Sequence, residues 1–278
     1  MPLSSISIAK FSLSLPTKSV LSILWVHISM CMNDKEEVCL LPARWRIVSG
    51  SWLKVIAMVS MVIDHVAAYL LRYDPDFTAT LFTVGSKQVS WCFLMRCIGR
   101  LAFPLFAFLL VEGFLHTHDR VKYGRNLLVF ALLSEIPYDL VRRGSLFAGG
   151  QNVFFTLFLG FLALYAVERW ESGKYSPGRL AVILISLIGI GVLFHTDYGS
   201  TGVGFILLLY VLRHNRILQA AIGCCYLPMR LIAGLAFIPI NLYNGQRGFI
   251  QGHIGKYLFY IFYPLHLLAI YLIRRLMM

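Results

Sequence analysis

The sequence predicts an all-α protein built as a polytopic bundle of transmembrane helices. Of its 278 residues, 58% are hydrophobic and only 14% are charged, and the mean hydropathy is +0.73. This composition lies far from that of soluble domains. A membrane-spanning helix needs roughly 20 mostly apolar residues, and the chain after residue 50 holds about eight such segments. We therefore expect one membrane domain over residues 51–278.

Hydrophobic runs and the polar turns between them set the expected helices, with ends uncertain by a few residues. Pro104, Pro137 and Pro264 fall inside three of these helices, where proline is expected to kink the helix and free backbone carbonyls. The eight helices are expected at residues 52–71, 91–115, 125–141, 152–168, 179–195, 200–213, 217–242 and 256–275.

The first 50 residues form a separate region, to which we assign no function. Residues 19–32 make an apolar run that is short for a membrane span, and an acidic cluster at 34–37 follows it. Three interpretations are open. The run is a signal-like segment, since lysines precede it, or an interfacial helix, or part of an extension upstream of a protein that starts near Met30 or Met32.

Basic residues outside the helix interiors predict the orientation, because lysine and arginine are enriched in cytoplasmic loops. The larger set, which we place in the cytoplasm, is Arg44, Arg46, Arg120, Lys122, Arg125, Arg169, Lys174, Arg179, Arg213, Arg216, Arg274 and Arg275. The outer set is Arg72, Lys87, Arg142, Arg143, Arg247 and Lys256. Both ends of the eight-helix core then face the cytoplasm. The Arg142–Arg143 pair argues against this orientation, and a seven- or nine-span arrangement is the alternative.

The net charge of +12 does not indicate nucleic-acid binding. The basic residues are scattered at helix ends, where they set topology and meet anionic lipid. The six cysteines lack the spacing of metal ligands, and four lie inside hydrophobic segments. We therefore expect the lipid bilayer as a partner, no nucleic acid, no metal site and no disulfide framework.

Several ionisable residues are expected at a similar depth in the bundle, and we call them the polar layer. Its members are Asp64, His65, Arg96, Arg100, Glu135, Asp139 and His266. A charge in hydrocarbon costs several kcal/mol, so such side chains normally face the bundle interior and pair with one another. One interpretation is that the two arginines neutralise Glu135 and Asp139 and only fix helix register. The other is a functional site.

Asp64 and His65 are adjacent but are not expected to act as a dyad. Neighbouring residues on a helix point about 100° apart, so Asp64 cannot orient the imidazole of His65 as the carboxylate of a catalytic triad does. We expect Asp64 to face Arg96 or Arg100. Histidine exchanges protons near neutral pH, so His65 is the candidate base.

Six segments together resemble the TraX family of membrane proteins, which includes the F-pilin acetylase. The resemblance covers about residues 51–275 in order, and GRLAFPLFAF and FYPLHL are its most specific parts. The segments are LKVIAMVSMVIDH (53–65), RCIGRLAFPLFAFLLVEGFLHT (96–117), LLSEIPYDL (132–140), QNVFFTLFLG (151–160), DYGSTG (197–202) and KYLFYIFYPLHLLAIYLI (256–273).

The resemblance implies an acetyltransferase of the bacterial inner membrane, which uses acetyl-CoA to modify an N-terminal amine, as in the maturation of conjugative pilin. The family is also similar to a wider group of multispan acyltransferases, including membrane O-acetyltransferases and lysosomal heparan N-acetyltransferases. In that group a histidine on an early helix is central to transfer. On this chain it would be His65, with Asp64 beside it. The acceptor would be pilin or another protein or glycan at the outer face.

The chemistry of acyl transfer can be matched to the residues. It needs a base, a group that polarises the thioester carbonyl, and a site for the CoA phosphates. His65 suits the base, Arg96 or Arg100 polarises the carbonyl or holds Asp64, and Glu135 and Asp139 complete the catalytic layer. The cations expected to hold the phosphates are Lys54, Arg120, Lys122 and Arg125. The residues expected to contact substrate are His266, Asn152 and Asp197.

The expected depths add a constraint, since acetyl-CoA is cytosolic while His65 lies in the outer half of the membrane. As a hypothesis, the pantetheine arm enters a channel between the first, second, third and last helices, and the acceptor enters from outside. Transfer is then direct or passes through an acetyl-histidine.

Two other functions use the same residues. Intramembrane Asp, Glu, Arg and His also form proton relays, so a proton-coupled transporter is the main alternative. We find no internal repeat of the kind that many transporters show. A non-enzymatic assembly factor for a surface structure is the third possibility.

Overall fold

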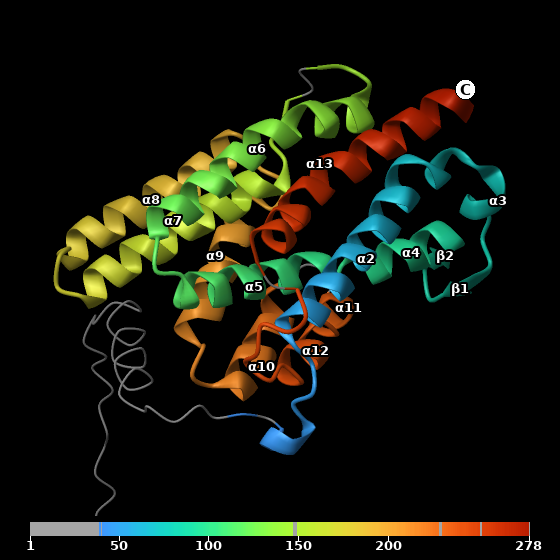
Figure 1. Ribbon diagram of the computed structural model, residues 1–278. Helices are drawn as coiled ribbons and strands as arrows, with labels where there is room; N and C mark the ends of the chain where they lie inside the picture. Colours follow the sequence, from blue (N-terminus) through green and yellow to red (C-terminus); the bar gives the residue numbers. More distant parts are fainter. Residues whose placement is uncertain (1–38, 40, 147–148, 228–229, 251, 278) are drawn as a thin grey trace, which may run out of the picture.

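The computed structural model describes residues 39, 41–146, 149–227, 230–250 and 252–277. The interpretations of residues 19–32 and of the acidic cluster at 34–37 lie outside this part of the chain. The described residues are mostly helical, as predicted, with one small β-hairpin that the sequence analysis did not predict (Figure 1).

The elements follow one another with short connections. The 3₁₀ turns are η1 (Ala43–Trp45) and η2 (Leu71–Tyr73), and the antiparallel hairpin is β1 (Phe82–Val84) and β2 (Lys87–Val89). The helices are α2 (Gly50–Tyr69), α3 (Pro75–Thr78), α4 (Trp91–Gly99), α5 (Ala102–His116), α6 (Arg120–Arg143), α7 (Val153–Glu171), α8 (Pro177–Leu193), α9 (Gly199–Val211), α10 (Arg216–Tyr226), α11 (Arg230–Gly234), α12 (Phe237–Asn241) and α13 (Gly252–Met277).

Four helical segments in the described chain are long and apolar enough to cross a membrane. They are Gly50–Tyr73, Trp91–His116, Val153–Glu171 and Tyr257–Met277. Helices α8 and α9 are apolar but shorter, as is the segment Ile232–Asn241. The length and apolarity of these helices support a membrane protein, whereas the predicted count of eight spans is not confirmed.

Side chains fix where several helices begin. A Ser, Asp or Asn precedes each of these helices and accepts a hydrogen bond from a backbone N–H of the first turn, which would otherwise lack a partner. The capping residues are Ser90 for α4, Asp119 for α6, Asn152 for α7, Ser176 for α8 and Asn215 for α10.

The predicted helix at 91–115 is broken into α4 and α5. Around the break, Arg100 and Leu101 donate backbone hydrogen bonds to residues three positions earlier, at 3.2 Å each, which tightens the turn. Pro104 explains the break, because its ring cannot coexist with a regular helical carbonyl four residues before it, at Arg100. The break places Arg100 at a junction between two helices.

The prediction of a single helix over 217–242 is wrong. At its start, the Arg216 guanidinium lies 6.0 Å from the ring centroid of Tyr243, which follows the end of α12. Between these points α10 packs against α11 and α12. The lack of a side chain at Gly223 lets the ring of Phe237 approach α10. This segment therefore enters and leaves at the same end of the bundle.

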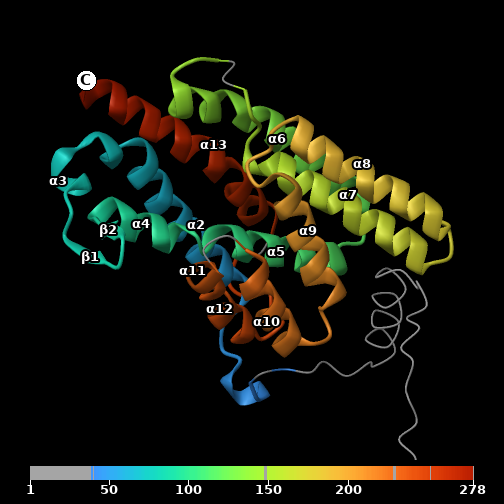
Figure 2. The same cartoon turned by 180° about the vertical axis from the view of Figure 1, so that it is seen from behind.

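Helices α2 and α13 run in the same direction (Figures 1 and 2). Near their starts, the backbone N–H of Gly50 donates to the carbonyl of Gln246 at 2.8 Å. Near their ends, the guanidinium of Arg274 lies 5.0 Å from the ring centroid of Tyr73 and donates to the carbonyl of Val141 at 3.2 Å. We call the first end the basic end, since Lys54 and Arg120 lie there, and the second the hairpin end, since β1 and β2 lie there.

The parallel course of α2 and α13 corrects the predicted topology. A core with both ends on one side requires these two helices to be antiparallel. Because the 216–243 segment turns back, the described helices from α2 to α13 pass between the two ends an odd number of times, as the alternative with seven or nine spans expects. Arg274 consequently lies at the hairpin end, and Arg247, bonded through its carbonyl to the backbone of Ser51 at 2.9 Å, lies at the basic end.

Close helix packing depends on small residues, as is usual between membrane helices. A Cβ atom on Gly99 of α4 would collide with the side chain of Asp64 on α2, and a Cβ on Gly160 of α7 would collide with Ile206 of α9. Large aromatic side chains fill the core between the helices, among them the fully buried Phe108, Phe114 and Phe205.

Candidate active site

The two histidines of the polar layer form a hydrogen-bonded pair. Nδ1 of His65 on α2 lies 2.7 Å from Nε2 of His266 on α13. The two rings are almost coplanar, with an interplanar angle of 3° and centroids 5.0 Å apart. The other ring nitrogen of His266, Nδ1, lies 2.9 Å from the carbonyl oxygen of Phe262. The sequence predicted His266 as a substrate contact, whereas the structure places it against the candidate base.

Asp64 forms an ion pair with Arg96, one of its two predicted partners. Oδ2 of Asp64 lies 2.5 Å from a terminal guanidinium nitrogen of Arg96, and the side chains are 17% and 35% exposed. The other carboxylate oxygen, Oδ1, is buried and has no hydrogen-bond partner within the described residues. Asp64 and His65 thus face different helices, which confirms that they are not a dyad.

The interpretation in which Arg96 and Arg100 pair with Glu135 and Asp139 is wrong. Arg96 is bound to Asp64, and Oε2 of Glu135 instead accepts a hydrogen bond of 2.5 Å from the side-chain amide of Asn152. Asp139 is buried one turn further along α6. The Nε atom of Arg100 is buried without a hydrogen-bond partner in the part of the chain that the structure describes.

Asn152 has a structural role in place of the predicted substrate contact. Its side-chain nitrogen donates to Glu135 and to the carbonyl of Ala131, at 2.8 Å in the latter case. Its side-chain oxygen accepts from the backbone N–H of Phe154 at 3.0 Å, which caps α7. Both amide donors are used, so Asn152 joins α6 to α7.

Asp197 lies in the turn between α8 and α9 and faces the polar layer. Its side chain is exposed, and it interacts electrostatically with Arg142, Asp64, Arg100 and Arg96. The turn itself is fixed, because the backbone N–H of Thr196 donates to a carbonyl of α8 at 3.1 Å. Asp197 therefore lies near Asp64, Arg96 and Arg100, on the hairpin-end side of the polar layer.

A cavity of about 820 Å³ opens at the basic end, between α2, α5, α6, α7 and α13. Four of these helices are those predicted to enclose a channel. Lys54, Arg247 and the carboxyl-bearing Glu112 lie around its basic end, and its interior is lined mainly by apolar and aromatic side chains. Its size is within the range of small-molecule and cofactor sites.

The inner end of the cavity reaches Tyr263, a buried residue of α13. The ring centroid of Tyr263 lies 6.2 Å from that of His65 and 5.5 Å from that of His266. Tyr263 thus borders both the cavity and the histidine pair. Tyr69 packs on His65 from the same helix, with ring centroids 5.6 Å apart.

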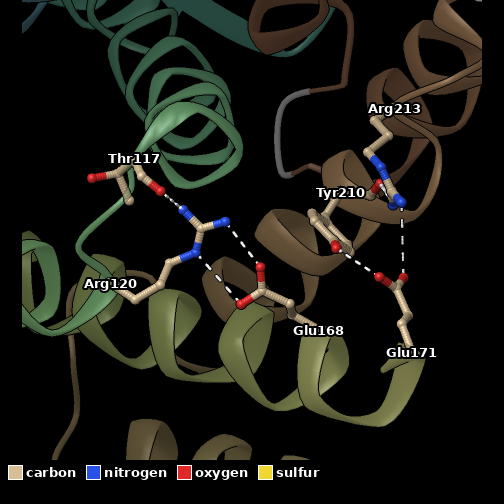
Figure 3. A network of polar contacts seen from close by, with 6 residues as sticks. All are labelled: Thr117, Arg120, Glu168, Glu171, Tyr210 and Arg213. Carbon is tan, nitrogen blue, oxygen red and sulfur yellow. Dashed lines mark hydrogen bonds and ion pairs between the residues drawn. The ribbon is translucent and has the colours of Figure 1, made fainter. Parts of the chain in front are cut away.

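Of the four cations predicted to hold phosphates, only Lys54 lines this cavity. Arg120 is held in a separate network, in which its guanidinium binds both carboxylate oxygens of Glu168, at 2.9 and 3.4 Å, and the carbonyl of Thr117 (Figure 3). Lys122 and Arg125 are exposed on α6. Arg247, which was not among the four, lines the cavity with Lys54.

Figure 3 also shows the second half of this network. Oε2 of Glu171 accepts a hydrogen bond of 2.9 Å from the hydroxyl of Tyr210, and its Oε1 lies 3.8 Å from Arg213. Arg213 in turn donates to the backbone carbonyl of Tyr210 at 2.9 Å. We call the residues of Figure 3 the basic-end network. It ties the end of α7 to α9 and to the start of α6.

Two residues that the sequence analysis missed belong to the site. Tyr263 lies three residues before His266 and so on nearly the same helix face, a spacing that could have indicated it. Arg247 lies in a loop, and its position depends on the backbone contact with Ser51. No periodicity in the sequence could have placed it.

Comparisons with known proteins agree with the resemblance. A family model described as "TraX protein" matches residues 49–274. The chain is 30% identical over 252 residues to the "Probable fimbrial assembly protein FimC, serogroup H1" of Dichelobacter nodosus, covering 79% of this chain and 93% of that protein. It is 22% identical over 177 residues to the "Uncharacterized protein RP591" of Rickettsia prowazekii (strain Madrid E), covering 64% and 60% respectively. No solved structure matches significantly.

Proposed function

Because the chain belongs to the TraX family, we propose that it is an integral membrane acetyltransferase, which moves an acetyl group from acetyl-CoA to an amine. One observation carries the proposal. A cavity of about 820 Å³ is lined by Lys54 at the basic end and by Tyr263, whose ring centroid lies 6.2 Å from that of His65 and 5.5 Å from that of His266.

The cavity suits the donor by its chemistry. CoA carries an anionic, phosphorylated head on a long and narrow arm that ends in the thioester. Lys54 and Arg247 supply positive charge for phosphate groups at the basic end. The apolar interior excludes water from the arm. The basic end then faces the cytosol of a bacterium, in agreement with the excess of basic residues there. Transfer then requires the thioester to pass the buried ring of Tyr263.

The reaction balances with groups on the chain. The neutral amine attacks the thioester carbonyl, a C–N bond forms, the C–S bond breaks, and His65 takes the proton that the amine loses. The same proton goes to the departing thiolate, which leaves as CoA thiol. Arg96 or Arg100 stabilises the negative charge that develops on the carbonyl oxygen. We favour Arg100, because its Nε has no hydrogen-bond partner among the described residues.

The acceptor reaches the histidines from the hairpin end, past Asp197. The relative from D. nodosus is named as a probable fimbrial assembly protein, which favours a pilin or another exported subunit with a free N-terminal amine. The acetylated product then belongs to surface-fibre assembly.

Purified protein in lipid nanodiscs, supplied with radioactive acetyl-CoA and a short peptide with a free N-terminus, tests the proposal. We expect labelled peptide from the wild-type chain and a loss of about 10²–10⁴-fold in the His65→Ala variant, the usual contribution of a general base. Label that stays on the wild-type chain without peptide, but not on His65→Gln, indicates an acetyl-histidine intermediate. Intact masses of surface proteins, with and without this gene, identify the natural acceptor.

A matched pair of variants tests the cavity itself. Leu109→Trp places an indole in the cavity lining, whereas Leu132→Trp on α6 adds the same group to an exposed position. We expect only the first to block acetyl transfer. Equal activity of the two, or solute flux that follows a pH gradient without acetyl-CoA, contradicts the proposal, and the second result favours a transporter.

A further inference from the structure

We infer that His266 is a positioning residue, which holds the proton of His65 on Nδ1 and so leaves Nε2 of His65 as the basic atom of the site. This inference deepens the proposed function and rests on it for its catalytic meaning. Its structural content, the position of one proton, stands on hydrogen-bond geometry alone.

The positions of the ring protons on His65 and His266 follow from the hydrogen bond to the carbonyl oxygen of Phe262. The oxygen of Phe262 can only accept, so Nδ1 of His266, 2.9 Å away, carries a hydrogen. A neutral imidazole has one N–H, so Nε2 of His266 presents a lone pair. The short contact of 2.7 Å then requires His65 to donate from its Nδ1. Nε2 of His65 is left with a free lone pair.

The alternative, with His266 doubly protonated and donating to His65, is disfavoured by the surroundings. Aromatic rings pack on the pair, with Phe262 stacked on His266 at 5.1 Å and Tyr263 at 5.5 Å. Arg96 already places a positive charge close enough to interact with His65. Within the described chain, neither imidazole has a carboxylate at ion-pair distance. A resting positive charge on the pair would therefore be uncompensated.

The same geometry shows where a proton cannot go. A backbone carbonyl does not take up a proton, so the chain of hydrogen bonds from His65 ends at Phe262. A proton that His65 accepts on Nε2 has to leave from Nε2. His266 strengthens its bond to His65 when that ring becomes charged, and it thereby stabilises the transient imidazolium. The pair suits a base that returns its proton to a leaving group, and it does not suit a relay across the membrane.

Nitrogen-15 NMR of the full-length protein in nanodiscs, with ring-labelled histidine, tests the proton position. The signals of the pair are assigned by their loss in His65→Gln and in His266→Gln. We expect His65 to show a protonated Nδ1 and an unprotonated Nε2. A protonated Nε2 on His65 in the wild-type chain overturns the inference. This readout needs no acetyl transfer, so it is independent of whether the proposed function holds.

Two amides at position 266 separate positioning from packing. Glutamine can present its oxygen near the site of Nε2 and keep the bond to His65. The shorter asparagine reaches only the site of Nδ1 and keeps the bond to Phe262. We expect His266→Gln to retain the His65 tautomer and at least a tenth of the acetyl transfer to the test peptide. We expect His266→Asn to lose the tautomer preference and about 100-fold in rate, a loss typical of partners that orient a reactive group.

Binding of acetyl-CoA, measured by calorimetry, is expected to be the same in both variants, which shows that they are folded. Equal rates and equal spectra for His266→Gln and His266→Asn, with donor binding intact, overturn the positioning role. A wild-type chain that shows the expected tautomer but transfers no acetyl group overturns the proposed function and leaves the structural assignment in place.

Discussion

Two arginine–carboxylate pairs in this protein are both partly buried but have different surroundings. Asp64 and Arg96 are 17% and 35% exposed, and Glu168 and Arg120 are 34% and 21% exposed. In the basic-end network both oxygens of Glu168 bind Arg120, which also binds the carbonyl of Thr117. In the polar layer only one oxygen of Asp64 has a hydrogen-bond partner among the described residues.

The difference indicates which pair is structural. A carboxylate and a guanidinium that satisfy each other bidentately have little capacity left for a ligand. The polar layer, by contrast, retains buried atoms without partners in the described structure, on Asp64 and on Arg100. A buried polar atom that lacks a partner is costly. The basic-end network thus joins helices, whereas the unpartnered atoms of Asp64 and Arg100 in the described structure support the function proposed for the polar layer.

Among the variants that compare these two regions, the largest effect is expected from breaking the Asp64–Arg96 pair. Asp64→Ala leaves the Arg96 charge uncompensated near His65 and opposes the imidazolium that forms during transfer. An unpaired charge in such a setting is worth about 2 kcal/mol, or roughly 30-fold in rate. Acetyl transfer to the test peptide measures the loss.

Two controls accompany this variant. The double variant Asp64→Ala/Arg96→Ala removes both charges and is expected to recover much of the rate. Glu168→Ala, in the basic-end network, is expected to stay within about twofold of wild type. A similar loss in Glu168→Ala and Asp64→Ala would remove the distinction between the two regions.

A smaller effect is expected from Gly99→Ala, which tests the packing beneath Asp64. The new Cβ would collide with the Asp64 side chain, and overpacking of this kind costs about 1–2 kcal/mol. Unfolding in detergent with increasing denaturant measures the loss of stability. Gly189→Ala on α8 is the control, because a Cβ there meets no atom within 4 Å. Equal stability of the two variants would mean that α2 and α4 do not approach closely at Asp64.

The smallest effect is expected from the cations that face the donor. Lys54 lines the cavity, whereas Lys122 is exposed on α6. We expect Lys54→Gln to raise the KM for acetyl-CoA about fivefold, since a solvated ion pair contributes about 1 kcal/mol. Lys122→Gln is expected to leave KM unchanged. A larger increase in KM for Lys122→Gln than for Lys54→Gln would instead indicate that acetyl-CoA binds beside α6, as the sequence predicted.

The sequence predicted best those features that depend on a single helix, namely its apolarity and the directions of its side chains. The composition and the apolar runs predicted membrane helices, and the rotation of about 100° between neighbouring helical residues separated Asp64 from His65. The pairing of Asp64 with one of two arginines was predicted in the same way. A distortion of the helix near Pro104 was predicted, but the residues at which the helix divides were not.

The errors came from contacts between distant segments. The 216–243 segment is apolar enough to be read as one span, and only its packing on itself shows that it turns back. That single turn reversed the direction of α13 relative to the prediction and moved Arg274 to the hairpin end. The partner of Glu135 was also mistaken, because Asn152 was not considered as a cap that competes with the arginines.

By itself, the sequence determined the helical class, the family and the chemical content of the polar layer, because these depend on local composition, periodicity and motifs. Only the tertiary structure decided that His65 contacts His266, that Lys54 lies with Arg247 at one cavity, and that Arg120 is engaged elsewhere. His65 and His266 are 201 residues apart in the chain, and a hydrogen bond between them depends on the direction and rotation of two helices. Those quantities are set by packing against every neighbouring helix.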